Sequence, residues 1–196
     1  MKLTILGIKV TVSYLFCASV CLMMLCDRTG LFIPMLLAMF IHEMGHLLLM
    51  WIYDCAPTEI KLIPGSVQIC SPVCESKPVV LILIAGPIIN IIVFAIVFLS
   101  IIMFRDTYYL DFALVNLIYG VFNLLPLTGL DGGSALEEVL IRKKGLAFAR
   151  RILNIITVCF TLATLSVAVF LSILGVVNYS VYILVLYLIL SILFKF

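Results

Sequence analysis

Charge is scarce in this sequence: Asp, Glu, Lys and Arg make up 11% of its 196 residues, against about 25% in a typical soluble domain. Basic runs with interleaved aromatic residues are lacking, so nothing points to nucleic acid as a partner. Internal repeats and low-complexity tracts are lacking too. Hydrophobic residues instead account for 65% of the chain, and the mean hydropathy is +1.35. This composition predicts an integral, all-α polytopic membrane protein.

Uncharged gaps predict six membrane-spanning helices in a single transmembrane domain, residues 1–196, because a helix needs about 20 apolar residues to cross a bilayer. The last gap, residues 152–194, would form a helix about twice as long as the hydrocarbon core is thick, so we expect one turn within it. A signal peptide is the alternative for the first gap, but no small-residue cleavage site follows it. The predicted spans are residues 10–26, 31–53, 79–104, 112–130, 152–174 and 178–194.

The basic residues predict that both chain ends are cytosolic. With the N-terminus inside, only Arg28 and Arg105 fall in outer loops, as the positive-inside rule requires. In the loop after the second span, Glu59–Ile63 and Ser66–Cys70 alternate in polarity around a Pro-Gly pair, which predicts a short membrane-proximal β-hairpin. Isolated hairpins are marginally stable, so this one needs the membrane surface or an added strand.

Both histidines of the chain lie in one run of the second span, His42-Glu43-Met44-Gly45-His46. Residues four apart share a helix face, so the two imidazoles can converge on one ion, with Glu43 beside them. On a soluble helix this pattern is often only a solvated face, but at membrane depth the same groups are costly without a partner. The spacing therefore predicts a zinc site with His42 and His46 as ligands.

A catalytic zinc site uses three protein ligands, and the chain has no third histidine. Asp131 is the strongest remaining candidate because it follows an apolar run and lies in a segment, residues 123–133, that contains Pro126 and three glycines. Such broken backbone is tolerated at membrane depth only where protein or a water-filled cavity satisfies it. We therefore expect Asp131 to be the third ligand. The alternative is an aspartate that caps the following helix.

Three motifs together resemble the site-2 protease family of intramembrane zinc metalloproteases. They are the HExxH run of the second span, Ala85-Gly86-Pro87-Ile88-Ile89-Asn90 in the third, and Asn123…Pro126…Leu130-Asp131-Gly132 in the fourth. Within that family the chain is similar to the compact six-span group that includes sporulation proteases acting on a membrane-tethered sigma-factor precursor. We expect it to lack the PDZ domain of the stress-response branch and the CBS domain often appended to the sporulation type.

The resemblance implies regulated intramembrane proteolysis: zinc-dependent cleavage of a membrane-tethered substrate in or near its transmembrane segment. It also implies a regulatory membrane partner. Six spans with the active site nearer the cytosolic side fit a multi-pass protein of a bacterial plasma membrane. The remaining alternatives are a catalytically silent metal-binding membrane protein and a zinc transporter. Glu43 between the histidines favours hydrolysis, since an ion carrier gains nothing from a positioned base.

In the expected mechanism Glu43 takes a proton from water that zinc has made acidic. Asn90 and Asn123 are candidates to support the substrate or the oxyanion, because an amide is unfavourable in lipid without a partner. Interhelical hydrogen bonding is the alternative for both. The Glu59–Cys70 hairpin is expected to receive the unwound substrate as an added strand.

Overall fold

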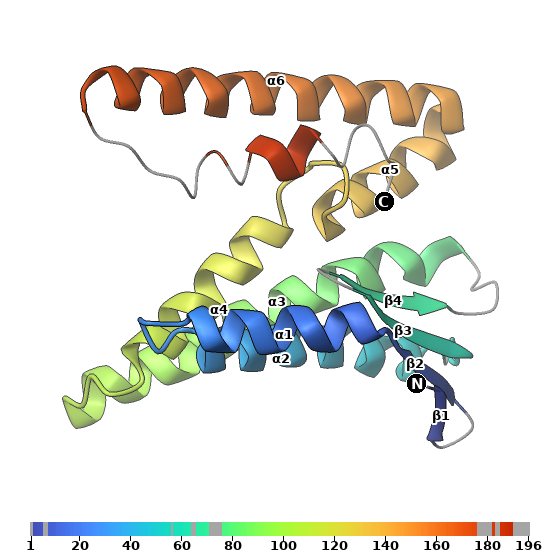
Figure 1. Cartoon of the computed structure of the whole chain (residues 1–196). Helices are drawn as coiled ribbons and strands as arrows, with labels where there is room; N and C mark the ends of the chain where they lie inside the picture. The colour runs from blue at the N-terminus through green and yellow to red at the C-terminus, as the bar shows by residue number, and fades with distance from the viewer. Residues whose placement is uncertain are drawn as a thin grey trace. The chain divides into compact units, whose positions relative to one another are not determined.

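A computed structural model describes residues 2–5, 8–55, 57–63, 66–70, 76–175, 182 and 185–189. The chain forms two compact units, Met1–Phe122 and Asn123–Phe196. The first unit contains a sheet and a set of helices, and the described part of the second unit is helical (Figure 1). That all 196 residues act as a single domain stays a prediction.

The helices of the first unit are built from the uncharged runs of the sequence. Their bounds are α1 Tyr14–Cys26, α2 Phe32–Ile52, α3 Ser76–Phe104 and α4 Leu110–Asn123. Glycines set how closely three of them pack. A Cβ on Gly45 of α2 would lie 2.8 Å from the carbonyl oxygen of Ala85 on α3, and a Cβ on Gly120 of α4 would lie 2.8 Å from that of Pro87. Small residues therefore bring α2 and α4 against the α3 backbone.

The predicted hairpin is confirmed and is part of a larger sheet. Strands β1 Lys2–Ile5, β2 Ile8–Val12, β3 Glu59–Ile63 and β4 Ser66–Cys70 lie in the order β1-β2-β3-β4. β1 pairs antiparallel with β2, β2 pairs parallel with β3, and β3 pairs antiparallel with β4. The added strand that the hairpin needs is thus supplied by the N-terminal segment of the same chain.

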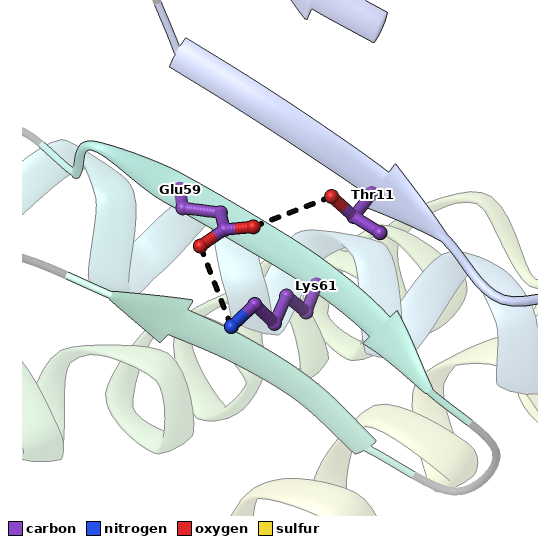
Figure 2. A network of polar contacts seen from close by, with 3 residues as sticks. All are labelled: Thr11, Glu59 and Lys61. Carbon is purple, nitrogen blue, oxygen red and sulfur yellow. Dashed lines mark hydrogen bonds and ion pairs between the residues drawn. The ribbon is translucent and has the colours of Figure 1, made fainter. Parts of the chain in front are cut away.

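Residues 10–12, predicted as the start of the first span, belong to β2 instead, and α1 begins at Tyr14. Polar residues explain the difference, because Lys9 and Thr11 alternate with apolar residues as a strand requires. Thr11 Oγ1 donates to Glu59 Oε1 at 3.3 Å, and Lys61 Nζ lies 3.4 Å from Glu59 Oε2 (Figure 2). Because these contacts are only partly buried, they help to fix the register of the strands more than they add stability.

The second unit contains α5 Asp131–Lys144 and α6 Leu146–Ile173. Gly145, with φ +84°, separates the two helices. Arg142 Nε pairs with Glu138 Oε1 at 3.0 Å within α5, and Arg150 Nε of α6 pairs with Glu137 Oε1 of α5 at 3.4 Å, which links the two helices near this corner. α6 begins at Leu146, before the predicted span at residue 152, and its first turns carry the exposed Arg150 and Arg151.

Three described helices are long and apolar enough to cross a membrane: Phe32–Ile52, Pro78–Phe104 and Leu146–Ile173. Tyr14–Cys26 and Leu110–Asn123 are shorter apolar helices. The predicted span 112–130 is therefore too long, since α4 ends at Asn123 and a loop follows it. Most of the predicted span 178–194 lies outside the described residues. The chain is a mostly helical membrane protein, and the count of six spans stays a prediction.

Candidate metal centre

His42 and His46 project from α2 one turn apart and are buried, with 3% and 8% of their surface exposed. Their Nε2 atoms lie 3.1 Å from each other. The Nδ1 atom of His46 lies 2.7 Å from the carbonyl oxygen of Ile82, and that of His42 lies 2.8 Å from Asn90 Oδ1. Both rings are therefore held at Nδ1 by α3, and both direct Nε2 toward the same point.

The partners of the two Nδ1 atoms decide what the Nε2 atoms can do. A carbonyl oxygen only accepts, so His46 Nδ1 carries the hydrogen and its Nε2 keeps a lone pair. Asn90 likewise presents its oxygen to His42. In these tautomers the two Nε2 atoms face each other with their lone pairs, which is the arrangement in which two imidazoles can bind one cation.

Zinc fits this donor pair. Nitrogens bound tetrahedrally at about 2.0–2.1 Å from one ion would lie roughly 3.3 Å apart, close to the separation found here. Gly86 on α3 keeps the space beside them open, since its Cβ would contact His46 Nε2 and lie 2.9 Å from His42 Nε2. Imidazole nitrogen is a preferred zinc ligand, and neutral rings are the form that binds it.

Glu43 and Tyr119 are two further neighbours of His42 in the first unit. Glu43 follows His42 directly on α2 and is half-buried. The Tyr119 ring, on α4, meets the His42 ring edge-on with centroids 5.0 Å apart. Sequence reasoning missed Tyr119 and the space-keeping role of Gly86. Tyr119 lies three residues after Asn116, so the i, i+3 spacing of polar residues on α4 is the signal that could have found it.

Asp131 is the first residue of α5, in the second unit. The N-cap position belongs to Leu130, so Asp131 is not the helix cap that the alternative reading required. As a carboxylate in the first turn, it is still favoured by the helix macrodipole. The structure thus places the two histidines together on α2 and Asp131 at a helix start in the other unit.

The loop before Asp131 is fixed by buried contacts within the second unit. Thr157 on α6 is fully buried and donates its hydroxyl to the Leu153 carbonyl at 2.9 Å. Its Oγ1 accepts from the Thr128 backbone N–H at 3.0 Å and contacts Thr128 Oγ1 at 3.1 Å. A Cβ on Gly133 would meet the Leu127 carbonyl, so α5 begins in close contact with the same loop.

The two candidate asparagines have different surroundings. Asn90 is fully buried and hydrogen-bonds to groups on α2 and α4. Asn123 is the last residue of α4 and is half-buried. Support of substrate or oxyanion by either residue stays a prediction.

Three comparisons with known proteins bear on this arrangement. Residues 105–167 match the model of peptidase family M50. A curated zinc metalloprotease of Methanocaldococcus jannaschii, MJ0392, is 34% identical over 122 residues, which cover 59% of this chain and 35% of that protein. The chain therefore spans about a third of the length of this curated relative.

A solved structure gives a wider match. The site-2 protease from Methanocaldococcus jannaschii superposes with a TM-score of 0.70 at 25% sequence identity, covering 98% of this chain and 93% of the other.

Proposed function

From the match of residues 105–167 to the model of peptidase family M50 and from the fold shared with a site-2 protease, we propose that the chain is a zinc-dependent intramembrane endopeptidase. Its reaction is hydrolysis of a peptide bond in or near the transmembrane segment of a membrane-tethered protein. The observation that carries the proposal is the buried imidazole pair, with Nε2 atoms 3.1 Å apart and Glu43 next to it on the same helix.

The proposed zinc ligands are His42, His46 and Asp131. Two imidazoles leave a zinc ion short of the three protein ligands usual in catalytic sites. Asp131 supports the assignment in three ways: it lies in the segment that matches family M50, it begins a helix, and a tightly held loop positions it. A carboxylate also offsets part of the ion's charge in a medium that solvates charge poorly.

Glu43 is the proposed general base and acid. A bound zinc ion supplies a Lewis acid that polarises a carbonyl group and makes water more acidic. Glu43 accepts a proton from the water whose oxygen bonds to the substrate carbonyl carbon. When the C–N bond breaks, Glu43 returns that proton to the leaving amine, so it ends the cycle ionised as it began.

The edge of β4 is the proposed receiver of the unwound substrate. β2 occupies one side of β3, and within the described strands β4 pairs with β3 alone. An extended peptide added at β4 would satisfy the backbone groups that unwinding exposes. Val67→Pro or Ile69→Pro should lower cleavage with zinc content unchanged, whereas Val67→Thr, which keeps the amide, should not. Unchanged turnover in both proline variants would remove this role from β4.

Membrane placement and partners follow from the proposed reaction. Its substrate is a transmembrane protein, its surroundings are membrane lipid, and a regulatory membrane protein is an expected partner. We place the chain in a bacterial plasma membrane with both termini and the active-site side facing the cytosol, on the distribution of its basic residues.

The proposal is tested by comparing the wild type with Glu43→Gln and Asp131→Asn in proteoliposomes that contain a single-span substrate. Bound zinc and substrate cleavage are measured for each protein. Glu43→Gln should keep zinc and lose cleavage, and Asp131→Asn should lose zinc. Full zinc in Asp131→Asn would exclude this residue as a ligand. Zinc movement across the vesicle without proteolysis would show a transporter, and bound zinc with neither activity would show a silent metal-binding protein.

A further inference from the structure

Three buried polar side chains form one hydrogen-bonded chain across α2, α3 and α4. His42 Nδ1 lies 2.8 Å from Asn90 Oδ1, and Asn90 Nδ2 donates to Asn116 Oδ1 at 2.9 Å. Both asparagines have 0% of their surface exposed. The amide chain, defined here as Asn90 and Asn116, thus ends on a proposed zinc ligand.

Two backbone carbonyls fix the direction of every hydrogen bond in the amide chain. Asn116 Nδ2 donates to the Phe112 carbonyl at 2.9 Å, so Asn116 turns its oxygen toward Asn90. Asn90 Nδ2 donates to the Ala38 carbonyl at 2.9 Å. Since carbonyl oxygens cannot donate, neither amide can be turned over without setting acceptor against acceptor in a buried site.

The direction of these hydrogen bonds determines the tautomer of His42. With both Nδ2 hydrogens of Asn90 engaged, only its oxygen is left for the ring, and His42 Nδ1 must donate. The His42 Nε2 atom therefore keeps its lone pair and points at His46 Nε2.

We propose that Asn90 is a positioning residue that selects the metal-binding tautomer of His42, and that Asn116 holds Asn90 in the required orientation. The inference rests on the proposed function, because the ring it prepares is a ligand of that zinc site. An outer partner that fixes the tautomer and direction of a ligand imidazole raises metal affinity by about 10–100-fold. In this role Asn90 acts through His42.

The test is nitrogen NMR of the histidine rings in the full chain in detergent micelles, before and after a chelator removes zinc. The chain has only two histidines, so each ring can be assigned. In the wild type without zinc, both rings should carry hydrogen on Nδ1. In Asn90→Leu, His42 should become a mixture of tautomers while His46, which donates to a backbone carbonyl, stays unchanged. Zinc affinity should fall about 10–100-fold.

Two variants of Asn116 separate positioning from packing. Asn116→Leu removes the acceptor for Asn90 and should shift the His42 tautomer in the same direction as Asn90→Leu, by a smaller amount. In Asn116→Asp, burial favours the neutral carboxyl group. Its O–H can donate to the Phe112 carbonyl and its C=O can accept from Asn90, so the hydrogen-bond pattern of the wild type is restored. This variant should recover the wild-type tautomer and zinc affinity. Asn154→Leu, an exposed position on α6, is the matched control and should change neither reading.

A His42 ring that carries hydrogen on Nε2 in the zinc-free wild type would overturn the inference. So would an unchanged tautomer and zinc affinity in Asn90→Leu, or, if that variant does not fold, equal readings for Asn116→Leu and Asn116→Asp. These readings do not require proteolysis. A wild type that has the expected tautomers and binds zinc but cleaves nothing contradicts the proposed activity and leaves the role of Asn90 intact.

Discussion

The two units hold their proposed zinc ligands by different means. In the first unit, His42 and His46 stand on a long helix, and groups on neighbouring helices bond to the far side of each ring. In the second, Asp131 begins a helix, and the loop before it is folded by contacts to Thr157 and to glycines. The first arrangement determines the tautomer and orientation of each histidine ring, and the second determines the course of the backbone that leads to Asp131.

This difference predicts that substitutions in the two units impair zinc binding in different ways. A change near the histidines should alter the imidazoles while the fold stays the same. A change near Asp131 should move the backbone and leave the histidine rings as they are. NMR of the histidine rings and zinc affinity, measured together, distinguish these two effects.

The largest effect is expected from Gly86→Ala. The added methyl group would occupy the space beside His46 Nε2 and His42 Nε2, where the ion must sit. Zinc affinity should fall by more than roughly 100-fold, beyond the usual loss from an outer-shell change, and cleavage should fall with it. Isothermal titration with zinc measures the affinity. Ser100→Ala on the same helix is the control, and wild-type affinity in Gly86→Ala would contradict the proposed position of the ion.

A smaller loss is expected from Gly133→Ala in the second unit. Its methyl group would meet the Leu127 carbonyl, so the loop must move and Asp131 with it. Zinc affinity should fall about 10–100-fold with the histidine ring spectrum of the zinc-free protein unchanged. Asn154→Leu, at the exposed position on α6, is again the control. A changed ring spectrum would show that the two arrangements are not separable in this way.

Thr157→Val tests the same loop by removing a hydroxyl and keeping the side-chain size. Loss of the partner for the Thr128 amide should destabilise the protein by about 1–3 kcal/mol, the cost of an unsatisfied buried group. Zinc affinity should fall up to about tenfold, corresponding to about 1.4 kcal/mol. Thermal unfolding in micelles measures the first effect, and Thr157→Ser should preserve both properties. Equal behaviour of the valine and serine variants would exclude the hydroxyl as the cause.

The smallest effect is expected at Asp27, which belongs to neither ligand arrangement. The backbone N–H of Phe32, then those of Thr29 and Gly30 and the Thr29 hydroxyl, hold the pKa of this carboxyl below its ordinary 3.8. A lowered pKa in the folded state adds stability at neutral pH, and this stability is lost as pH falls through the folded-state pKa.

Asp27→Ala should therefore melt slightly below the wild type at pH 7, with the difference shrinking below about pH 4. Zinc affinity should not change. A difference in melting temperature that grows with acidity would have the wrong sign for this explanation.

Local patterns predicted the hairpin and the histidine pair because both depend on short-range geometry. Alternation around Pro64-Gly65 defines two paired strands, and a spacing of four places His42 and His46 on one helix face. The parallel pairing of β2 with β3 joins segments about fifty residues apart, and hydropathy counts residues 10–12 as part of a span. The end of α4 at Asn123 was missed because apolar residues continue through the following loop.

The partners of the ligands could be predicted only in part. Asn90 is visibly polar in an apolar run, and interhelical hydrogen bonding was one of its two predicted roles. Its bond to His42 depends on how closely α2 and α3 pack, which no single segment encodes. Thr157 gives no signal at all, because one threonine in an apolar helix is ordinary and bonds its own helix.

X-ray absorption at the zinc edge, on the purified full chain in micelles, tests the central claim most directly, since it reports both the metal and its neighbours. We predict one zinc per chain with two imidazole nitrogens at about 2.0–2.1 Å, oxygen ligands completing the shell and no sulfur. Zinc bound by cysteine sulfur, zinc without imidazole neighbours, or an active protein without zinc would contradict the account.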